Sequence, residues 1–139
     1  MIVCRVLECQ SERFITCFGS DSETIVVGGT WKNWRKPLLF TYWVVDMSKH
    51  LTLEGHSGTV TGVVMGGEVI VSGGADRQVI LWRREDGVRI AVLTDHQLGV
   101  TALALYRNTL VTTALDWSVH FYGLTLPDIT TDFDATVQV

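Results

Sequence analysis

Residues 69–82 read VIVSGGADRQVILW, and this stretch decides the fold. Two runs of apolar, largely β-branched residues flank a short polar segment with two glycines, which is the pattern of two strands joined by a tight turn. Residues 109–122, TLVTTALDWSVHFY, repeat the arrangement further along the chain. Self-similarity at a fixed spacing is the signature of a repeat architecture, so we expect the chain to be built from copies of one unit.

Three segments of the chain align without gaps. They open on Ile15, Val60 and Val100, so the spacing between successive openings is nearly constant. Twelve residues after each opening comes an equivalent position, and it is occupied by Val27, Ser72 and Thr112. The constant count within each segment indicates three copies of one structural unit.

Each unit predicts four short antiparallel strands and no helix. In the second unit these strands are residues 60–63, 69–74, 78–82 and 89–93, with polar turns between the later ones. No segment keeps a helical spacing of apolar residues over three turns, so the predicted fold class is all-β. Four strands in about 40 residues, repeated along the chain, are typical of the blades of a β-propeller.

The composition agrees with a folded domain and excludes several classes of protein. Of 139 residues, 47% are hydrophobic and 19% are charged, a balance opposite to that of disordered chains. The formal net charge is −4, so no general excess of basic residues points to nucleic acid. The longest apolar run, residues 38–45, is far too short for a transmembrane helix, and no signal peptide is expected.

The three cysteines, Cys4, Cys9 and Cys17, form an odd set without the spacing of metal ligands. We expect reduced thiols that behave as small hydrophobic residues. Such thiols are typical of an intracellular protein, either cytoplasmic or nuclear.

Histidine and aspartate recur at the repeat spacing. His56 is separated from His96 by the same interval as Asp76 from Asp116, because each pair occupies one position in two successive repeats. Neither pair therefore predicts a metal site or a pair of catalytic carboxylates. No cofactor, no metal and no enzymatic activity are expected.

The second repeat resembles the WD-repeat family. Its matching residues are Gly55, His56, Ser72, Asp76 and Trp82. The resemblance implies a structural network in which hydrogen bonds join the histidine, the serine, the aspartate and the tryptophan. Such a network would satisfy polar groups that have few other partners inside a blade.

The other two repeats depart from the family pattern to different degrees. The third keeps the network positions as His96, Thr112, Asp116 and Tyr122, with Asp95 in place of the glycine. Tyr122 can still donate a hydroxyl hydrogen, so the resemblance implies an altered network there. In the first repeat Ser11, Val27 and Trp31 stand at or near the histidine, serine and aspartate positions, and only Trp43 matches. No network is expected in that repeat.

The architecture implied is an incomplete ring of about three blades in one domain, residues 1–139. Residues 1–10 are expected to form the last strand of a preceding blade, and residues 11–55, 56–95 and 96–139 three blades, the last with a C-terminal tail. Closed propellers have four to eight blades. We therefore favour a fragment of a larger propeller over self-association that closes the ring, and both over a free-standing arc.

One feature is not explained by the repeat. Ten residues separate Ser72 from Trp82, whereas sixteen separate Val27 from Trp43, and the six extra residues fall within residues 30–37. This segment holds five candidate partner-binding residues, namely Trp31, Lys32, Trp34, Arg35 and Lys36. Tryptophan and arginine dominate binding hot spots. The alternative is that both tryptophans fold back onto the blade while the charges merely solvate the loop.

In the resembled family this turn lies on the face that most often receives partners. The further candidates on that face are Ser57, Thr59, Ala75, Gln97 and Leu115. The function that the resemblance implies is a protein-interaction scaffold or adaptor, of which a substrate-receptor part of a ubiquitin ligase is one form. The alternatives are a catalytic or cofactor-binding propeller and nucleic-acid binding through the basic aromatic loop 31–36, which the acidic remainder of the chain disfavours. No membrane partner is expected.

Overall fold

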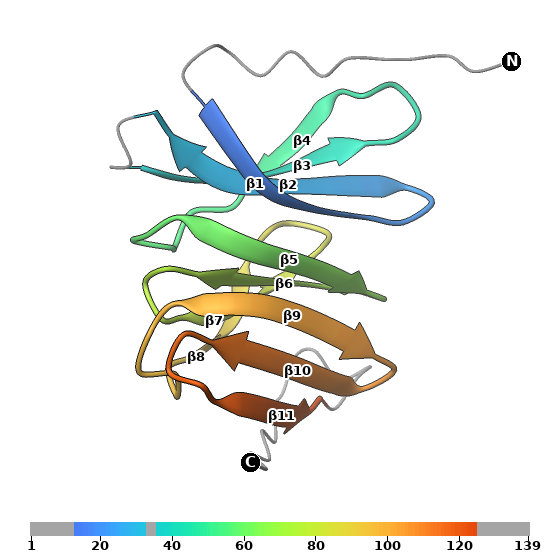
Figure 1. The fold of residues 1–139 in the computed structure, drawn as a ribbon. Helices are drawn as coiled ribbons and strands as arrows, with labels where there is room; N and C mark the ends of the chain where they lie inside the picture. The colour runs from blue at the N-terminus through green and yellow to red at the C-terminus, as the bar shows by residue number, and fades with distance from the viewer. Residues whose placement is uncertain (1–12, 33–35, 125–139) are drawn as a thin grey trace, which may run out of the picture.

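The computed structural model describes residues 13–32 and 36–124. Within them the chain forms three antiparallel sheets and no helix, as the sequence predicts (Figure 1). Blade 1 contains β1 (Arg13–Ser20), β2 (Thr24–Trp31), β3 (Pro37–Trp43) and β4 (Lys49–Thr52). Blade 2 contains β5 (Val60–Gly66), β6 (Val69–Gly74), β7 (Val79–Arg83) and β8 (Arg89–Leu93). Blade 3 contains β9 (Val100–Tyr106), β10 (Thr109–Ala114) and β11 (Val119–Gly123).

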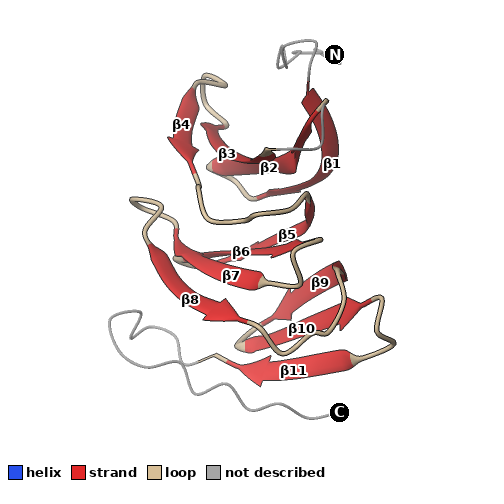
Figure 2. Cartoon of the chain, turned by 90° about the vertical axis from the view of Figure 1, so that its left-hand side faces the viewer, coloured by secondary structure: helices blue, strands red, loops and turns tan. Residues whose placement is uncertain are grey.

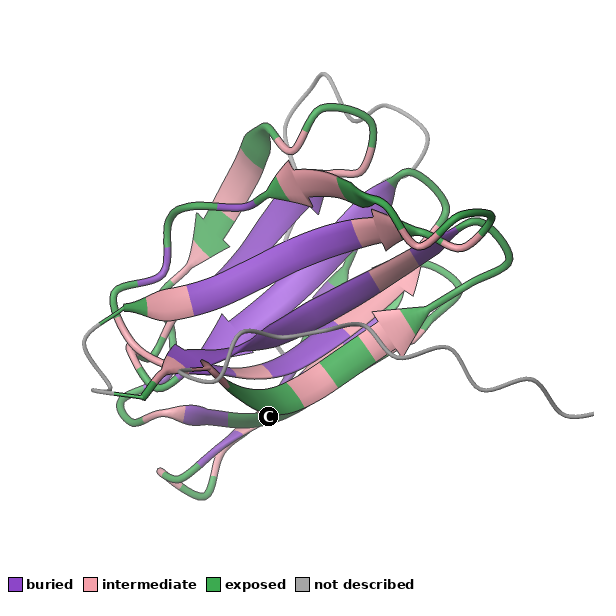
Figure 3. Cartoon of the chain, turned by 90° about the horizontal axis from the view of Figure 1, so that it is seen from above, coloured by how far each residue is buried: buried purple, intermediate pink, exposed green. Residues whose placement is uncertain are grey.

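Each blade is a meander in which successive strands pair with one another. The three sheets stack in sequence order, and the first strands, β1, β5 and β9, lie side by side (Figures 1 and 2). The middle strands carry the longest apolar runs, and every residue of β6 is buried (Figure 3). Burial on both faces explains why β6 lacks the alternation of apolar and polar residues that a half-exposed strand shows.

The stacking buries two apolar cores, one at each junction between blades. At the first junction Val26 and Leu39 of blade 1 pack with Ile70 and Trp82 of blade 2. At the second, β6 and β7 present Val69, Val71, Val79 and Leu81 to Val100, Leu110 and Tyr122 of blade 3. Alternate residues of the β6–β7 hairpin therefore face opposite neighbours, and blade 2 is enclosed on both sides.

A threonine at a β-bulge links each of the first two blades to the next one. Thr16 and Thr61 are skipped in the pairing of β1 with β2 and of β5 with β6, which is a bulge at the same place in each blade. The Thr16 hydroxyl donates to the backbone carbonyl of Val60, and the Thr61 hydroxyl donates to that of Val100. These bonds place the first residue of one blade against the inner hairpin of the blade before it.

Two glycines permit this close approach. A Cβ atom on Gly28 would lie 2.7 Å from Cγ1 of Val60, and one on Gly73 would lie 2.6 Å from Cγ1 of Val100. Both distances are too short for carbon atoms in contact, because the optimum is about 3.5–4.0 Å. Glycine is therefore required at this position wherever a valine of the next blade packs against it.

Several expectations lie outside the described residues. These are the strand expected in residues 1–10, the cysteines Cys4 and Cys9, and the C-terminal tail after residue 124. Cys17 is a free cysteine, and burial raises the pKa of its thiol. Within the described ranges the chain contains no helix that could span a membrane.

Candidate protein-interaction face

One end of the stacked sheets gathers the turns that the sequence analysis singled out. We call this end the turn face. It comprises the β2–β3, β6–β7 and β10–β11 turns and the β4–β5 and β8–β9 connections, and Figure 2 shows these segments beside one another. Backbone bonds from Ala75 N–H to Thr59 O (2.8 Å) and from Leu115 N–H to Gly99 O (3.0 Å) tie each turn to the connection beside it. These bonds fix the β6–β7 and β10–β11 turns against the neighbouring connections.

In blade 2 a continuous chain of hydrogen bonds runs beneath the turn face. Asp76 accepts from Nδ1–H of His56 at 2.9 Å, and His56 Nε2 lies 2.7 Å from the Ser72 hydroxyl. In the neutral ring with its hydrogen on Nδ1, Nε2 accepts from the Ser72 hydroxyl, and Ser72 Oγ in turn accepts from Trp82 Nε1–H at 2.8 Å. The network that the family resemblance implies is thus complete in this blade.

The carboxylate of Asp76 also holds the backbone of the turn face. It accepts from the backbone N–H groups of Ser57 at 2.8 Å and Gln78 at 3.1 Å. Burial raises the pKa of Asp76, but the hydrogen bonds and the charge interaction with His56 outweigh this effect, and the pKa lies below its ordinary value. Asp76 is therefore ionised and fully engaged within the protein.

Blade 3 replaces the direct bond between histidine and aspartate by a relay. The Ser118 hydroxyl donates to Asp116 and accepts from His96 Nδ1–H at 2.8 Å, while His96 Nε2 accepts from Thr112 at 2.7 Å. Hydrogen bonds from Ser118 and from the Gln97 backbone lower the pKa of Asp116. His96 Nδ1 and Asp116 Oδ2 are 3.7 Å apart, so Ser118 carries the connection.

Tyr122 and His120 complete the altered network. The Tyr122 hydroxyl donates to Asp95 at 2.9 Å and lies 3.1 Å from Nδ1 of His120. The rings of His96 and His120 are in contact at a tilt of 36°, with their centroids 4.3 Å apart. Burial lowers the pKa of His96, and the neighbouring His120 lowers it further. Burial and Asp95 together raise the pKa of Tyr122.

Sequence reasoning missed Ser118 and His120 as members of this network. The repeat alignment compared only the four family positions, and neither residue stands at one of them. The signal that could have located Ser118 is the aspartate two residues before it, because a serine or aspartate in a tight turn bonds to its near neighbours.

Blade 1 contains no such network among its described residues, and its strand register corrects one prediction. Ile25 pairs with Tyr42, as Ile70 pairs with Trp82, so Tyr42 and not Trp43 occupies the tryptophan position. Trp43 is 37% exposed, and its ring lies 4.1 Å from that of His50. The assignment of Trp43 was wrong because a count through an insertion does not reveal which of two adjacent aromatic residues points inward.

The corrected register changes the size and form of the insertion. Tyr42 follows Val27 by fifteen residues, so the insertion is five residues and not six. Four of these lengthen the hairpin. Blade 2 turns after a backbone bond from Gly74 N–H to Gln78 O (3.1 Å), whereas blade 1 continues through the pair Thr30↔Pro37 to a bond from Trp31 N–H to Lys36 O (2.9 Å). Within the expected loop, residues 30–37, Thr30, Trp31 and Pro37 are therefore strand residues, and Lys32 and Lys36 belong to the turn.

The predicted binding residues of this hairpin differ in their surroundings. Trp31 ends β2 and is half-buried, with the guanidinium of Arg13 lying 4.7 Å from its ring centre. Its indole nitrogen is buried and bonds to no other described residue. Lys32 and Lys36 are exposed. Trp34 and Arg35 lie outside the described residues, so only Trp31 is seen to fold back onto the blade.

The remaining predicted residues lie on the turn face, together with a cluster that sequence reasoning missed. Ser57, Ala75, Gln97 and Leu115 are exposed, and Thr59 is half-buried. Beside Leu115, which is 63% exposed, Trp117 is 96% exposed and Leu98 is 49% exposed. The backbone of Trp117 has a positive φ of 67°, which turns this residue outward at the tip of the β10–β11 turn. The repeat alignment concealed Trp117, because Arg77 stands at its position in blade 2.

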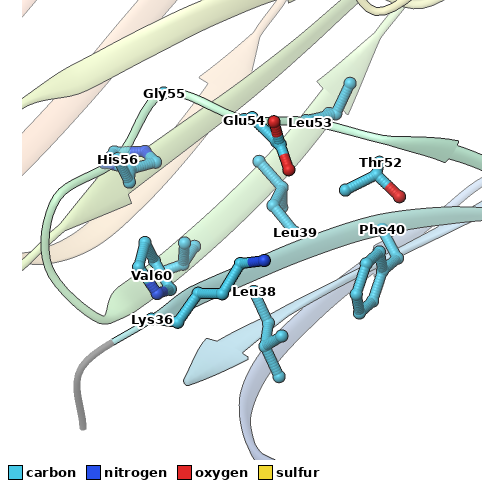
Figure 4. A pocket seen from close by; sticks show the side chains of 11 residues that line it. Lys36, Leu38, Leu39, Phe40, Thr52, Leu53, Glu54, Gly55, His56 and Val60 are labelled. Carbon is cyan, nitrogen blue, oxygen red and sulfur yellow. The ribbon is translucent and has the colours of Figure 1, made fainter. Parts of the chain in front are cut away.

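Two pockets open on the turn face, one at each junction between blades. The first has a volume of about 260 Å³ and is lined chiefly by Leu38, Leu39, Leu53 and Val60, with Lys36 and Glu54 beside them (Figure 4). The second, of about 310 Å³, is lined by Asp76, Arg77, Gln78, Thr94, His96 and Gln97. Among the described residues, no group of three or more histidine, cysteine, aspartate or glutamate side chains could hold a metal ion.

Comparison with known proteins identifies the repeat. Residues 47–83 match the family model of the WD domain, G-beta repeat. The F-box/WD repeat-containing protein sel-10 of Caenorhabditis elegans is 32% identical over 116 residues, which are 83% of this chain and 18% of that protein. The ribosome biogenesis protein YTM1 of Scheffersomyces stipitis is 32% identical over 104 residues, covering 60% of this chain and 22% of that protein. The chain thus spans about a fifth of the length of these relatives.

Solved structures agree with the sequence comparisons. The structure of U3-55K matches 79% of this chain and 34% of its own, with a TM-score of 0.70 and 25% identity. The computationally designed Ika4 protein matches 86% of this chain and 96% of its own, with a TM-score of 0.60 and 20% identity, a likeness of fold alone. Together with the three stacked sheets and the network of blade 2, these matches show that the chain belongs to the WD40-repeat β-propeller family, of which it forms a partial ring of about three blades.

Proposed function

We propose that this chain is a protein-interaction scaffold that binds partner proteins or peptides through its turn face, and that it is not an enzyme. The observation that carries the proposal is the exposed apolar cluster of Leu98, Leu115 and Trp117 on that face. A tryptophan that is 96% exposed contributes nothing to the packing of its own blade. Tryptophan is also the residue type most enriched among binding hot spots, so this cluster is the principal anchor.

The β2–β3 hairpin supplies the second part of the proposed face. Lys32 and Lys36 are exposed at its tip, and Trp34 and Arg35 belong to the same turn, outside the described residues. Positive charge at the rim would steer an acidic partner and raise its association rate, an effect that salt weakens. Ser57, Thr59, Ala75 and Gln97 lie between the hairpin and the Trp117 cluster along the blades and would complete the contact surface.

We further propose that this chain works as part of a larger assembly. The similarity to an F-box/WD repeat-containing protein supports a role as a substrate-receptor part of a ubiquitin ligase, and the similarity to a ribosome biogenesis protein supports a role in assembling ribosomes. Either role would place the chain inside the cell, which fits the expected cytoplasmic or nuclear location. Both relatives extend far beyond the matched segment, so neighbouring domains would decide between the two roles.

The open side of blade 3 supports the proposal that further blades, or a second copy of this chain, complete the surface. Val71, Val79 and Leu81 are at most 1% exposed under blade 3, whereas their counterparts Val111, Val119 and Phe121 face outward, the last two being 38% and 41% exposed. The bulge threonine of this blade, Thr101, bonds to no following blade within the described residues, and its hydroxyl lies 2.8 Å from that of Thr113. A blade docked here would offer Thr101 a backbone carbonyl.

The test compares partner binding after the loss of Trp117 with partner binding after the loss of an exposed aromatic residue at the opposite end of the blades. We expect Trp117→Ala to reduce partner recovery from a cell extract by about tenfold, as loss of an anchor does. Tyr106, 70% exposed at the end of β9 beside the β9–β10 turn, is the control, and Tyr106→Ala should retain the same partners. Partners are identified by quantitative mass spectrometry with the full chain as bait. Equal recovery by both folded variants would refute the proposed face.

A further inference from the structure

The two pockets on the turn face are equivalent positions of the repeat. His56 lies in the first and His96, its counterpart one repeat later, lies in the second. Glu54 of the first pocket corresponds in the same way to Thr94 of the second. The pockets thus occupy the same place at successive junctions between blades. Their chemistry differs, because the first is walled by leucine and valine and the second by polar and charged side chains.

The first pocket suits a single apolar side chain. Its volume of about 260 Å³ falls below the range of roughly 300–1,000 Å³ typical of small-molecule and cofactor sites. Leu38, Leu39 and Leu53 already pack within the blade, and their edges form an apolar wall (Figure 4). Lys36 and Glu54 stand beside it with opposite charges, so apolar contact and not net charge decides what enters.

The second pocket suits an anionic group. The carboxylate of Asp76 in its wall is already engaged, since it accepts from His56, Ser57 and Gln78. The guanidinium of Arg77, in contrast, is exposed and bonds to no other residue that the structure describes. Arg77 is also held at the tip of the β6–β7 turn by a positive φ of 71°. A planar guanidinium with free donors binds carboxylates in two-pronged fashion.

From this pairing we infer that the turn face binds an extended peptide segment that places one apolar side chain in the first pocket and one acidic side chain against Arg77 in the second. The inference deepens the proposed function, on which it rests, by naming the class of partner. The two pockets act as separate contacts joined by the peptide backbone. Their contributions to the binding constant multiply only when the spacing between the two side chains of the peptide matches the spacing of the pockets.

A panel of short peptides tests the inference. The probes are fluorescently labelled peptides with one leucine and one glutamate, at a series of increasing spacings, in a glycine–serine background. Binding to the full 139-residue chain is measured by fluorescence anisotropy. We expect one narrow range of spacings to bind, with a loss of about tenfold when the peptide's leucine is changed to serine or its glutamate to glutamine.

Two protein variants locate the contacts. Thr52→Tyr places a larger side chain at the exposed margin of the first pocket, and Arg77→Gln removes the charge of the second. For the Thr52→Tyr variant, changing the peptide's leucine to serine should leave its affinity unchanged. For the Arg77→Gln variant, changing the peptide's glutamate to glutamine should leave its affinity unchanged. Arg107→Gln is the matched control, because Arg107 also has a positive φ (54°) but lies in the β9–β10 turn at the opposite end. It should leave binding unchanged.

The outcomes separate this inference from the proposed function. Absence of binding across the panel, or binding that both variants retain in full, overturns the peptide site. Partners that are lost with Trp117→Ala but kept with Thr52→Tyr and Arg77→Gln overturn the peptide site while leaving the proposed scaffold intact. Thermal unfolding of each variant establishes that it is folded before its binding is compared.

Discussion

Blades 2 and 3 share one repeat spacing, yet among the residues that the structure describes blade 2 is covered on both faces and blade 3 on one. Leu81 of blade 2 is 1% exposed beneath blade 3, whereas Phe121, its counterpart in blade 3, is 41% exposed. Glycine stands at position 73, where Val100 of the next blade approaches closely, and threonine stands at the equivalent position 113. The networks differ too, because His56 bonds directly to Asp76 whereas His96 reaches Asp116 through Ser118.

The comparison shows how one repeat is adapted to two environments. Beneath a neighbouring blade, a hairpin needs apolar side chains and a glycine at the point of closest approach. Thr113 brings a Cβ to that point, so a further blade that packs on blade 3 must offer a smaller residue than the valine found at positions 60 and 100. The bonding pattern under the turn face tolerates more variation, because different polar groups can satisfy one another.

The largest expected effect on stability compares a residue on the covered face of blade 2 with its counterpart on the open face of blade 3. Leu81→Ala should lower the free energy of unfolding by about 2–5 kcal/mol, because it leaves a cavity in the core between blades 2 and 3. Phe121→Ala should cost much less, since its side chain is already partly exposed to solvent. Urea denaturation followed by circular dichroism measures both. Equal losses at low protein concentration would contradict the difference between the faces.

The networks provide the second test. Asp76→Ala or His56→Ala should each cost about 1–3 kcal/mol of unfolding free energy, because each leaves a buried partner unsatisfied. The double variant should lose less than the sum, since both residues belong to one network. Asp116→Ala should cost less than Asp76→Ala, because Ser118 still contacts His96. Strict additivity in blade 2 would argue against a connected network.

Substitution of the close-approach glycine gives a third, similar or smaller effect. Gly73→Ala should cost about 1–3 kcal/mol of unfolding free energy, because the added Cβ would lie 2.6 Å from Val100 Cγ1. Thr113→Ala changes the same position on the open face and should stay within about 0.5 kcal/mol. Thermal unfolding of both variants, compared with the unmodified chain, distinguishes them. A neutral Gly73→Ala would mean that the blades can separate without cost.

The smallest expected effect concerns pH. Burial first, and then the neighbouring His120, lowers the pKa of His96 in the folded chain below the value of about 6.5 for an unfolded histidine. The contribution of neutral His96 to the free energy of unfolding is therefore fully present above pH ~6.5. It declines as the pH falls from there through the lowered pKa of the folded state, because His96 in the unfolded chain takes up a proton first. The pKa of Asp76 is also lowered, so protonation of Asp76 reduces the free energy of unfolding only below pH ~3.9.

Urea midpoints measured between pH 7.5 and pH 5 test this dependence. His96→Gln should flatten the decline, although it lowers stability at every pH. The control is His50→Gln, because His50 contacts the Trp43 ring in blade 1, away from the network of blade 3. If His96→Gln left the slope of the midpoint against pH unchanged, another group would have to account for the decline.

The candidate face was only partly predictable from the sequence. The turns of the turn face followed from the repeat, because glycine, aspartate and asparagine mark chain reversals at fixed offsets. The exposure of Trp117 did not follow from the repeat, because the burial of a tryptophan depends on the residues around it and not on its type. For the same reason Trp31, expected in a loop, proved to be a strand residue packed against Arg13.

The sequence by itself determined the all-β class, the strand order within each blade and the four network positions of blade 2. These follow from local periodicity and from a spacing that recurs between successive repeats, and both can be counted along the chain. Only the tertiary structure decided that Tyr42 points inward, that Ser118 relays the bond to His96, and where the two pockets open. Each of these depends on the register and approach of segments distant in sequence, which no local count of residues contains.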